Sequence, residues 1–213
     1  MGLREWIIAG AAIVGAVGTV AAVAYALYRD IWRQRRHRPL LSLQFDPIPS
    51  PSNLDLVTAG TTIMHWARLR VENKLGRKTA EEVEVLVLSF RFMDGEDSLA
   101  PLNDRLLPWV GLRSFDMQSP VSRTHIPAGI ARRVDLLSIY KTEAGTACGR
   151  LEAIPTVKDG RASILPGRYV VEVAVAARDI DAVRFAFEIQ FDGTWSDDSG
   201  IWSHLRVSPP RKV

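Results

Sequence analysis

The sequence predicts an all-β fold, an antiparallel β-sandwich, joined to one N-terminal transmembrane α-helix. Two observations support this prediction. Residues 6–28 form a stretch of 23 residues without a charged side chain, and about 20 apolar residues suffice for a helix to cross a hydrocarbon core of about 30 Å. Beyond Pro39, hydrophobic and polar residues alternate in about eight short segments, and no long segment follows a helical period. Short strands separated by turns favour a sandwich over an α/β fold.

The anchor begins after a short N-terminal cap, residues 1–5, and is followed by a basic juxtamembrane segment, residues 29–39. Aromatic side chains at its end resemble the belt that marks a membrane interface: Tyr25, Tyr28 and Trp32. The alternative is a cleaved signal peptide, because Ala22-Val23-Ala24 fits a cleavage site. The apolar run is longer than a signal core of about 7 to 15 residues, so we expect a retained, single-pass anchor. A lipid anchor on Gly2 is disfavoured because Trp6 stands where Ser or Thr is required.

The distribution of charge predicts the orientation. Five arginines follow the apolar run: Arg29, Arg33, Arg35, Arg36 and Arg38. Basic residues close to a span are retained on the cytoplasmic side, so the C-terminal domain is expected in the cytoplasm. The chain has a formal charge of +3; Asp30 offsets one of these arginines and Glu5 offsets Arg4, which leaves −1 for residues 39–213. The juxtamembrane arginines are therefore expected to contact anionic lipid headgroups, at about 1 kcal/mol each, and no nucleic-acid surface is expected on the domain.

Small residues within the anchor recur at intervals of four, in the row Ala11, Gly15 and Thr19. Such rows let two helices approach closely in lipid and would allow a homodimer through the transmembrane helix. The alternative is ordinary membrane-helix composition, which is rich in glycine and alanine.

The predicted domain covers residues 40–208, and residues 209–213 are expected to form a tail. Strands are expected at 40–45, 65–73, 80–92, 106–115 with a break near Gly111, 132–140, 168–175, 184–191 and 201–207. A proline-rich loop at 46–53 and a polar turn at 73–78 separate the first three strands. Val83, Val85 and Val87 alternate with glutamates before the strand becomes apolar on both faces, as expected for a strand in a sandwich.

The strand, turn and strand from Trp66 to Val85 resemble those of bacterial immunoglobulin-like modules of the adhesion-related kind. In these modules a Leu-x-Val-x-Asn strand, here Leu69 to Asn73, leads through a glycine turn at Gly76 into Ala-x-x-Val-x-Val, here Ala80 to Val85. Ile126-Pro127-Ala128-Gly129 and Pro166-Gly167-Arg168-Tyr169 are similar to other turns of the same fold. The resemblance covers about two thirds of the domain and implies an immunoglobulin-like sandwich, but no chemistry. The paired cysteines of antibody domains are absent.

The sequence contains no motif that predicts catalysis, a cofactor or a metal. The four histidines, at positions 37, 65, 125 and 204, lack metal-binding spacing. Cys148, the only cysteine, is expected as a non-catalytic thiol in a polar loop. The segment 191–198 holds three carboxylates and could ligate calcium, but Asp192-Gly193 is also a common hairpin turn. Trp195 and Trp202 are candidates for a partner-binding patch, or for core positions.

These features predict a single-span membrane protein that presents a non-catalytic interaction domain to a protein partner or a complex. Two alternatives remain: an exported or surface-facing adhesion-like module, and an enzyme with a dispersed site. Neither a substrate nor a partner can be named from the residues.

Overall fold

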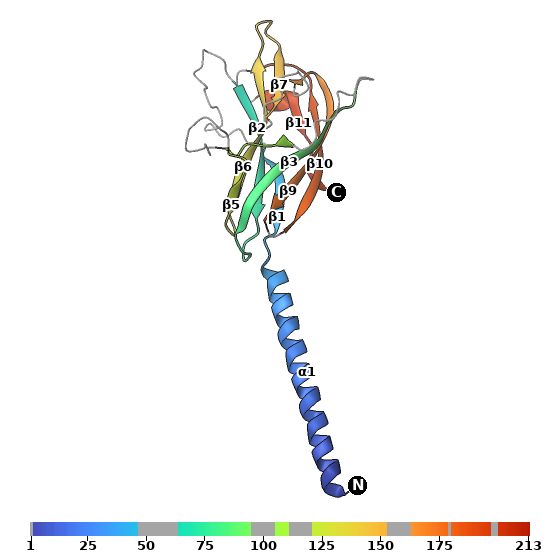
Figure 1. The fold of residues 1–213 in the computed structure, drawn as a ribbon. Helices are drawn as coiled ribbons and strands as arrows, with labels where there is room; N and C mark the ends of the chain where they lie inside the picture. The colour runs from blue at the N-terminus through green and yellow to red at the C-terminus, as the bar shows by residue number, and fades with distance from the viewer. Residues whose placement is uncertain are drawn as a thin grey trace. The chain divides into compact units, whose positions relative to one another are not determined.

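The structure, a computed structural model, describes residues 2–46, 64–94, 105–110, 121–152, 163–178, 180–196 and 200–213. The chain divides into two compact units, Met1–Arg38 and Pro39–Val213. The first is a long helix, and the second, which we call the β-domain, consists mostly of antiparallel sheet (Figure 1).

Helix α1 runs over Leu3–His37. It ends just before Pro39, because the residue that precedes a proline is disfavoured in helical backbone. Among the described residues, Val14–Trp32 is long and apolar enough to cross a membrane, with a mean hydropathy of 1.2. A signal sequence near the N-terminus would pass the same test.

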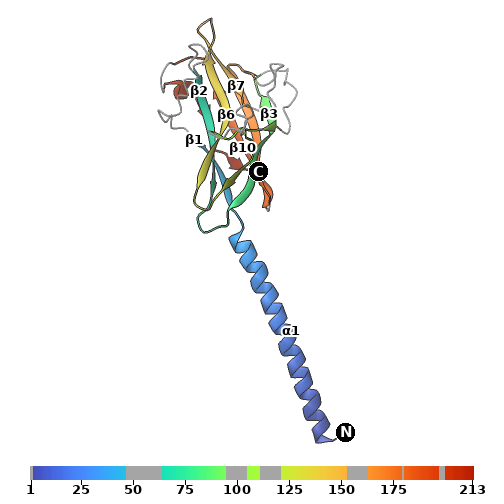
Figure 2. The ribbon, with the colours of Figure 1, turned by 60° about the vertical axis from the view of Figure 1, so that its left-hand side comes forward.

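The strands of the β-domain form two sheets (Figures 1 and 2). Among the described residues, the first sheet has the order β1 (Leu41–Asp46), β2 (Met64–Asn73), β6 (Ala131–Lys141), β7 (Ala147–Leu151) and β8 (Ser163–Ile164). The second has the order β11 (Leu205–Val207), β10 (Ile180–Phe191), β9 (Gly167–Ala177), β3 (Ala80–Phe92) and β4 (Arg105–Leu106). Strand β5 (Thr124–Ile126) pairs with β3, and β12 (Arg211–Lys212) pairs with β10.

One hydrophobic core takes side chains from both sheets. Leu69 and Val71 on β2, Val85 on β3 and Val173 on β9 are all fully buried. Of the alternating polar residues, Arg70 on β2 is exposed and Glu172 on β9 is partly exposed, whereas Arg68 on β2 is buried and pairs with Asp135. The period of two in the sequence correctly identified the strands β2, β3, β6, β9 and β10. The antiparallel, β-rich architecture that the sequence predicts is therefore present.

The structure differs from the predicted elements in several places. The short strands β5 and β8 were not expected. The strand expected at 201–207 begins as one helical turn, α2 (Ile201–His204), and only Leu205–Val207 pair with β10. Arg211 and Lys212, expected in the tail, also pair with β10. Cys148 lies on β7 and not in a loop: the small residues Ala147 and Gly149 are buried on one face of that strand and conceal its alternation in the sequence. The strand expected at 106–115 is much shorter in the structure: β4 ends at Leu106, and Trp109 makes only an isolated bridge to Val134. Residues 111–115 lie outside the described residues.

Asn73, the last residue of β2, organises the end of the β-domain at which the chain enters. Its fully buried side chain accepts a hydrogen bond from the Leu40 amide and donates to the carbonyl groups of Lys78 and Ile126. The backbone of Asn73 also bonds to Gly129 and Ile130. We call this region the entry end; it comprises Leu40, the β2–β3 turn (residues 74–79) and the β5–β6 turn (residues 127–130).

Candidate functional site

A cleft separates the edge strand β1 of the first sheet from β11 of the second. Its volume is about 390 Å³, and it is lined by Leu43, Gln44, Phe45, Val207, Pro209 and Pro210. The two walls belong to different sheets, so the cleft lies between two sheet edges.

The wall formed by β1 presents backbone groups that β2 does not use. Among the described residues β1 pairs only with β2, in an antiparallel register that sets Leu41 opposite Asn73. The amide of Lys74 bonds to the carbonyl of Leu40. Because antiparallel residues alternate in direction, residues 42 and 44 face β2, whereas the N–H and C=O groups of Leu41, Leu43 and Phe45 face the other way. Within the part of the chain that the structure describes, strand β1 therefore has an open edge along the cleft.

The wall formed by β11 is less able to pair with an additional strand. The Ser208 amide donates a hydrogen bond to the Glu188 carbonyl, and the Asp192 amide donates one to the His204 carbonyl. Residues 205, 207 and 209 consequently face away from β10. Pro209 has no N–H to donate at such an outward position, and proline is a common means of blocking an edge strand. Of the two edges, β1 is the one able to accept a further strand.

The two tryptophans of the candidate patch are half-buried and pack against the hydrophobic core. Trp195 stacks obliquely on His65, with ring centroids 5.0 Å apart. Trp202 packs edge-on against Phe45, which lines the cleft, with ring centroids 6.4 Å apart. The indole N–H of Trp202 is buried and has no hydrogen-bond partner among the described residues. Their role in partner binding remains a prediction.

The loop after β10 holds an aspartate and histidine pair. The Asp192 carboxylate lies 2.9 Å from Nδ1 of His204 and accepts a hydrogen bond from the Thr194 amide. Partial burial raises the pKa of Asp192, but these hydrogen bonds outweigh it, and the net shift is downward. The Ser203 hydroxyl donates to the carbonyl of Gly200, so it is directed to its own turn. The pair therefore links the start of β11 to the end of β10. Residues 197–199 lie outside the described part of the chain, so the calcium alternative stays a prediction.

The other candidate residues lie apart from the cleft. His65 is buried and donates from Nε2 to the carbonyl of Ser196. Cys148 faces Tyr140 across the β6–β7 pair, and the thiol, together with burial, raises the pKa of Tyr140. Within the described ranges no three His, Cys, Asp or Glu side chains are grouped closely enough to hold a metal ion.

The remaining candidates belong to the helix unit. Of the juxtamembrane arginines, Arg29, Arg33, Arg35 and Arg36 lie on α1 and Arg38 directly follows it. The Arg36 guanidinium lies 4.7 Å from the centre of the Trp32 ring. In the row Ala11, Gly15 and Thr19, the Thr19 hydroxyl donates a hydrogen bond to the Gly15 carbonyl one turn earlier. This hydroxyl is therefore bonded within its own helix. Helix association remains a prediction.

The cleft itself was missed by the sequence reasoning. Pro209 and Pro210 were the available signal, because a proline pair after a short strand is typical of a protected sheet edge. Comparison with known protein families, with characterised proteins and with solved structures finds no match to this chain. Its function must therefore be inferred from its own geometry.

Proposed function

We propose that the chain is a single-span membrane protein whose β-domain binds a partner protein and does not catalyse a reaction. The observation that carries this proposal is the open edge of β1 along the cleft. An extended segment of the partner would pair with the N–H and C=O groups of Leu41, Leu43 and Phe45 and so add a strand to the first sheet. The partner's alternate side chains would then enter the cleft.

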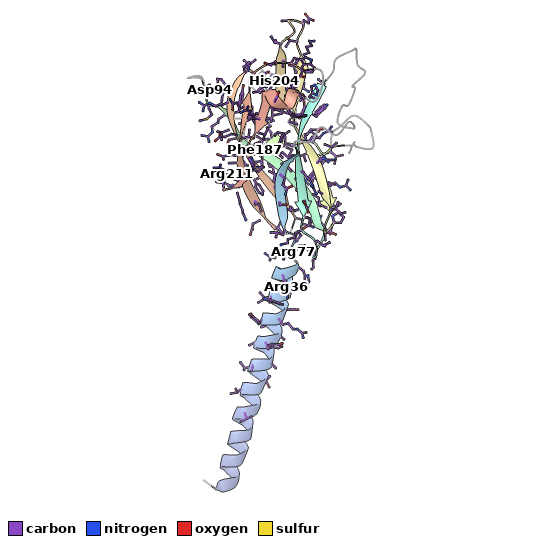
Figure 3. All side chains as sticks on the ribbon, turned by 180° about the vertical axis from the view of Figure 1, so that it is seen from behind. Arg36, Arg77, Asp94, Phe187, His204 and Arg211 are labelled. Carbon is purple, nitrogen blue, oxygen red and sulfur yellow. The ribbon has the colours of Figure 1, made fainter. Side chains whose placement is uncertain are left out.

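Charge next to the opposite wall, which is lined by Val207, Pro209 and Pro210, indicates which segment would fit. Residues 200–213 contain Arg206, Arg211 and Lys212 and no carboxylate side chain, and all three of these side chains are exposed (Figure 3 labels Arg211). Strand β1 has no charged side chain before Asp46. An extended segment that carries Asp or Glu would gain favourable interactions with these basic residues, which flank the lining residues Val207, Pro209 and Pro210 in the chain. Such interactions steer association and fix register.

We infer further that the β-domain is an immunoglobulin-like sandwich. The two antiparallel sheets around one core support this type, as does the passage of the chain from β2 in the first sheet to β3 in the second. The turn at Gly76, with a φ of 79°, lies where the resemblance requires a glycine.

The domain is proposed to face the cytoplasm, on the evidence of the five arginines after the apolar run. A fluorescent reporter fused after Val213 should be bright in the cytoplasm, and alkaline phosphatase fused there should be inactive. Active phosphatase would instead support the exported, adhesion-like alternative. Replacing Arg33, Arg35, Arg36 and Arg38 with Gln should weaken the cytoplasmic preference.

Site-specific photo-crosslinking in cells tests the binding cleft. A benzophenone side chain at Gln44, which is exposed and lines the cleft, should crosslink to one short acidic segment of another protein, identified by sequencing the crosslinked peptide. The matched control is the same side chain at Arg91, exposed on β3 of the other sheet. Arg206→Gln combined with Lys212→Gln should reduce the yield from Gln44. Equal products from both positions, or crosslinks at Gln44 to lipid only, would overturn the proposal.

A further inference from the structure

The chain passes from α1 to the open edge of β1 within a few residues. Helix α1 ends at His37, and the amide of Leu40 already donates a hydrogen bond to the side chain of Asn73. The Leu40 carbonyl accepts one from the amide of Lys74. The β-domain is therefore held together from Leu40 onward, directly before β1 begins, and only residues 38–39 separate it from the helix.

This short connection limits how far β1 can lie from a membrane. The apolar stretch of α1 ends at Trp32, and the helical residues 33–37 that follow rise about 7.5 Å. The chain from the end of α1 to Leu40 spans at most about 11 Å. Leu40 is therefore at most about 19 Å from Trp32, and the headgroup layer takes about 5–7 Å of this distance. This step rests on the proposed anchoring of α1 in a membrane.

A folded partner domain does not fit into a space of this width. A domain of about 100 residues has a radius of gyration of about 13 Å and is therefore about 34 Å across. An α-helix with its side chains is about 10–12 Å across, and an extended chain is no wider. Where the chain of the partner passes the Leu41 end of the open edge, there is room for a single extended or helical segment.

The open edge itself does little to exclude unwanted strands. Residues 41–45 contain neither a proline nor a charged side chain, and these are the usual means of blocking an exposed edge. The nearby membrane supplies a restriction that the edge lacks. An acidic segment that approaches from solution is repelled by anionic headgroups, whereas one that is tethered in the same bilayer by a short linker reaches an effective concentration in the millimolar range.

We infer that the segment that pairs with β1 is the juxtamembrane segment of another membrane protein, on the same side of the bilayer as the β-domain. Its chain would pass the Leu41 end of the open edge and enter the membrane as a transmembrane helix. The inference rests on the proposed function, because it names the class of partner that the open edge of β1 receives.

Photo-crosslinking from Gln44 in cells, with and without a spacer, tests the inference. A spacer of about 12 glycine and serine residues between Arg38 and Pro39 lengthens the connection about fivefold and keeps it flexible. Effective concentration falls with about the −3/2 power of linker length, so the crosslink yield should fall about tenfold. The matched control carries the same spacer after Val213, where it does not move the cleft, and should keep the yield.

The crosslinked peptide identifies the class of partner. It should lie within about 12 residues of a transmembrane span, since that length of chain covers the open edge and the distance to the membrane. The spacer should leave the midpoint of denaturant unfolding unchanged, because it is inserted before Leu40, where the hydrogen bonds of the β-domain begin.

The outcomes separate this inference from the proposed function. A partner without a membrane span, or a crosslink yield that the spacer does not change, would overturn the inference and leave the binding edge of β1 standing. A crosslink to a second copy of this chain would do the same. Equal products from Gln44 and from the control position Arg91, in the chain without a spacer, would overturn both.

Discussion

The two ends of the β-domain hold their loops in different ways. At the entry end, one fully buried side chain, that of Asn73, joins β1, the β2–β3 turn and β5. At the other end, where Figure 3 shows Asp94 and His204, the contacts lie near the surface: an ion pair of Asp94 with Arg168 and a hydrogen bond between Asp192 and His204. Asp94 accepts from both the amide and the guanidinium of Arg168, and the Arg168 side chain is 65% exposed. Similar hydrogen bonds therefore contribute differently to the free energy of folding at the two ends. Water can replace a broken hydrogen bond at the surface, but it cannot replace a buried one.

The largest expected effect is that of Asn73→Ala. It leaves the amide of Leu40 and the carbonyls of Lys78 and Ile126 without their partner. A buried polar group left unpaired costs about 1–3 kcal/mol, and we expect a total loss of about 2–4 kcal/mol because the exposed part of the turn can recruit water. Denaturant unfolding of the full chain in detergent, followed by tryptophan fluorescence, measures it.

Asn73→Asp sharpens the same comparison. It keeps an acceptor for Leu40 but places a carboxylate against two carbonyl oxygens, so it should destabilise the β-domain at least as much as alanine. A loss below about 1 kcal/mol for both variants, which is what an exposed contact contributes, would show that burial does not distinguish the two ends.

The smallest effect is expected at Asp94. The hydrogen bond from Arg168 holds the pKa of Asp94 below its ordinary value of about 3.9. A lowered pKa means that the contact stabilises the folded chain above about pH 4 and that this contribution is lost as the pH falls through the folded-state pKa. Arg168→Gln should raise the pKa of Asp94 toward its ordinary value, as measured by NMR titration of the carboxyl carbon, with little change in midpoint temperature.

Arg91→Gln is the control for this titration, since Arg91 pairs with Glu172 and not with Asp94. The pKa of Asp94 should stay lowered in that variant. If the pKa of Asp94 is unchanged in Arg168→Gln, the ion pair does not form in solution. If this variant instead loses much stability, exposed and buried contacts do not differ at the two ends of the β-domain.

The strands were predictable from the sequence where one face of the strand is exposed to solvent. The alternation of Val83, Val85 and Val87 with polar neighbours gave β3 with both ends correct, at Ala80 and Phe92. The alternation failed where the buried residues are small, as at Ala147 and Gly149 on β7, because such residues carry little hydrophobic signal. It also failed at Ile201, where one helical turn buries the same side chain that a strand would bury.

The candidate sites were less predictable than the strands. Trp195 and Trp202 could be selected by residue type, but the contact of Trp202 with Phe45 joins residues 157 positions apart. The open edge of β1 depends on which strands are neighbours, and strand order is a property of the whole sheet.

Three features follow from residues that are close together in the chain: an apolar helix long enough to span a membrane, the basic segment after it and a domain of antiparallel strands. They could therefore be predicted without coordinates. The cleft between β1 and β11 and the buried contacts of Asn73 follow only from the tertiary structure. Each of these joins segments that are distant in sequence, and their pairing is set by the packing of one shared core.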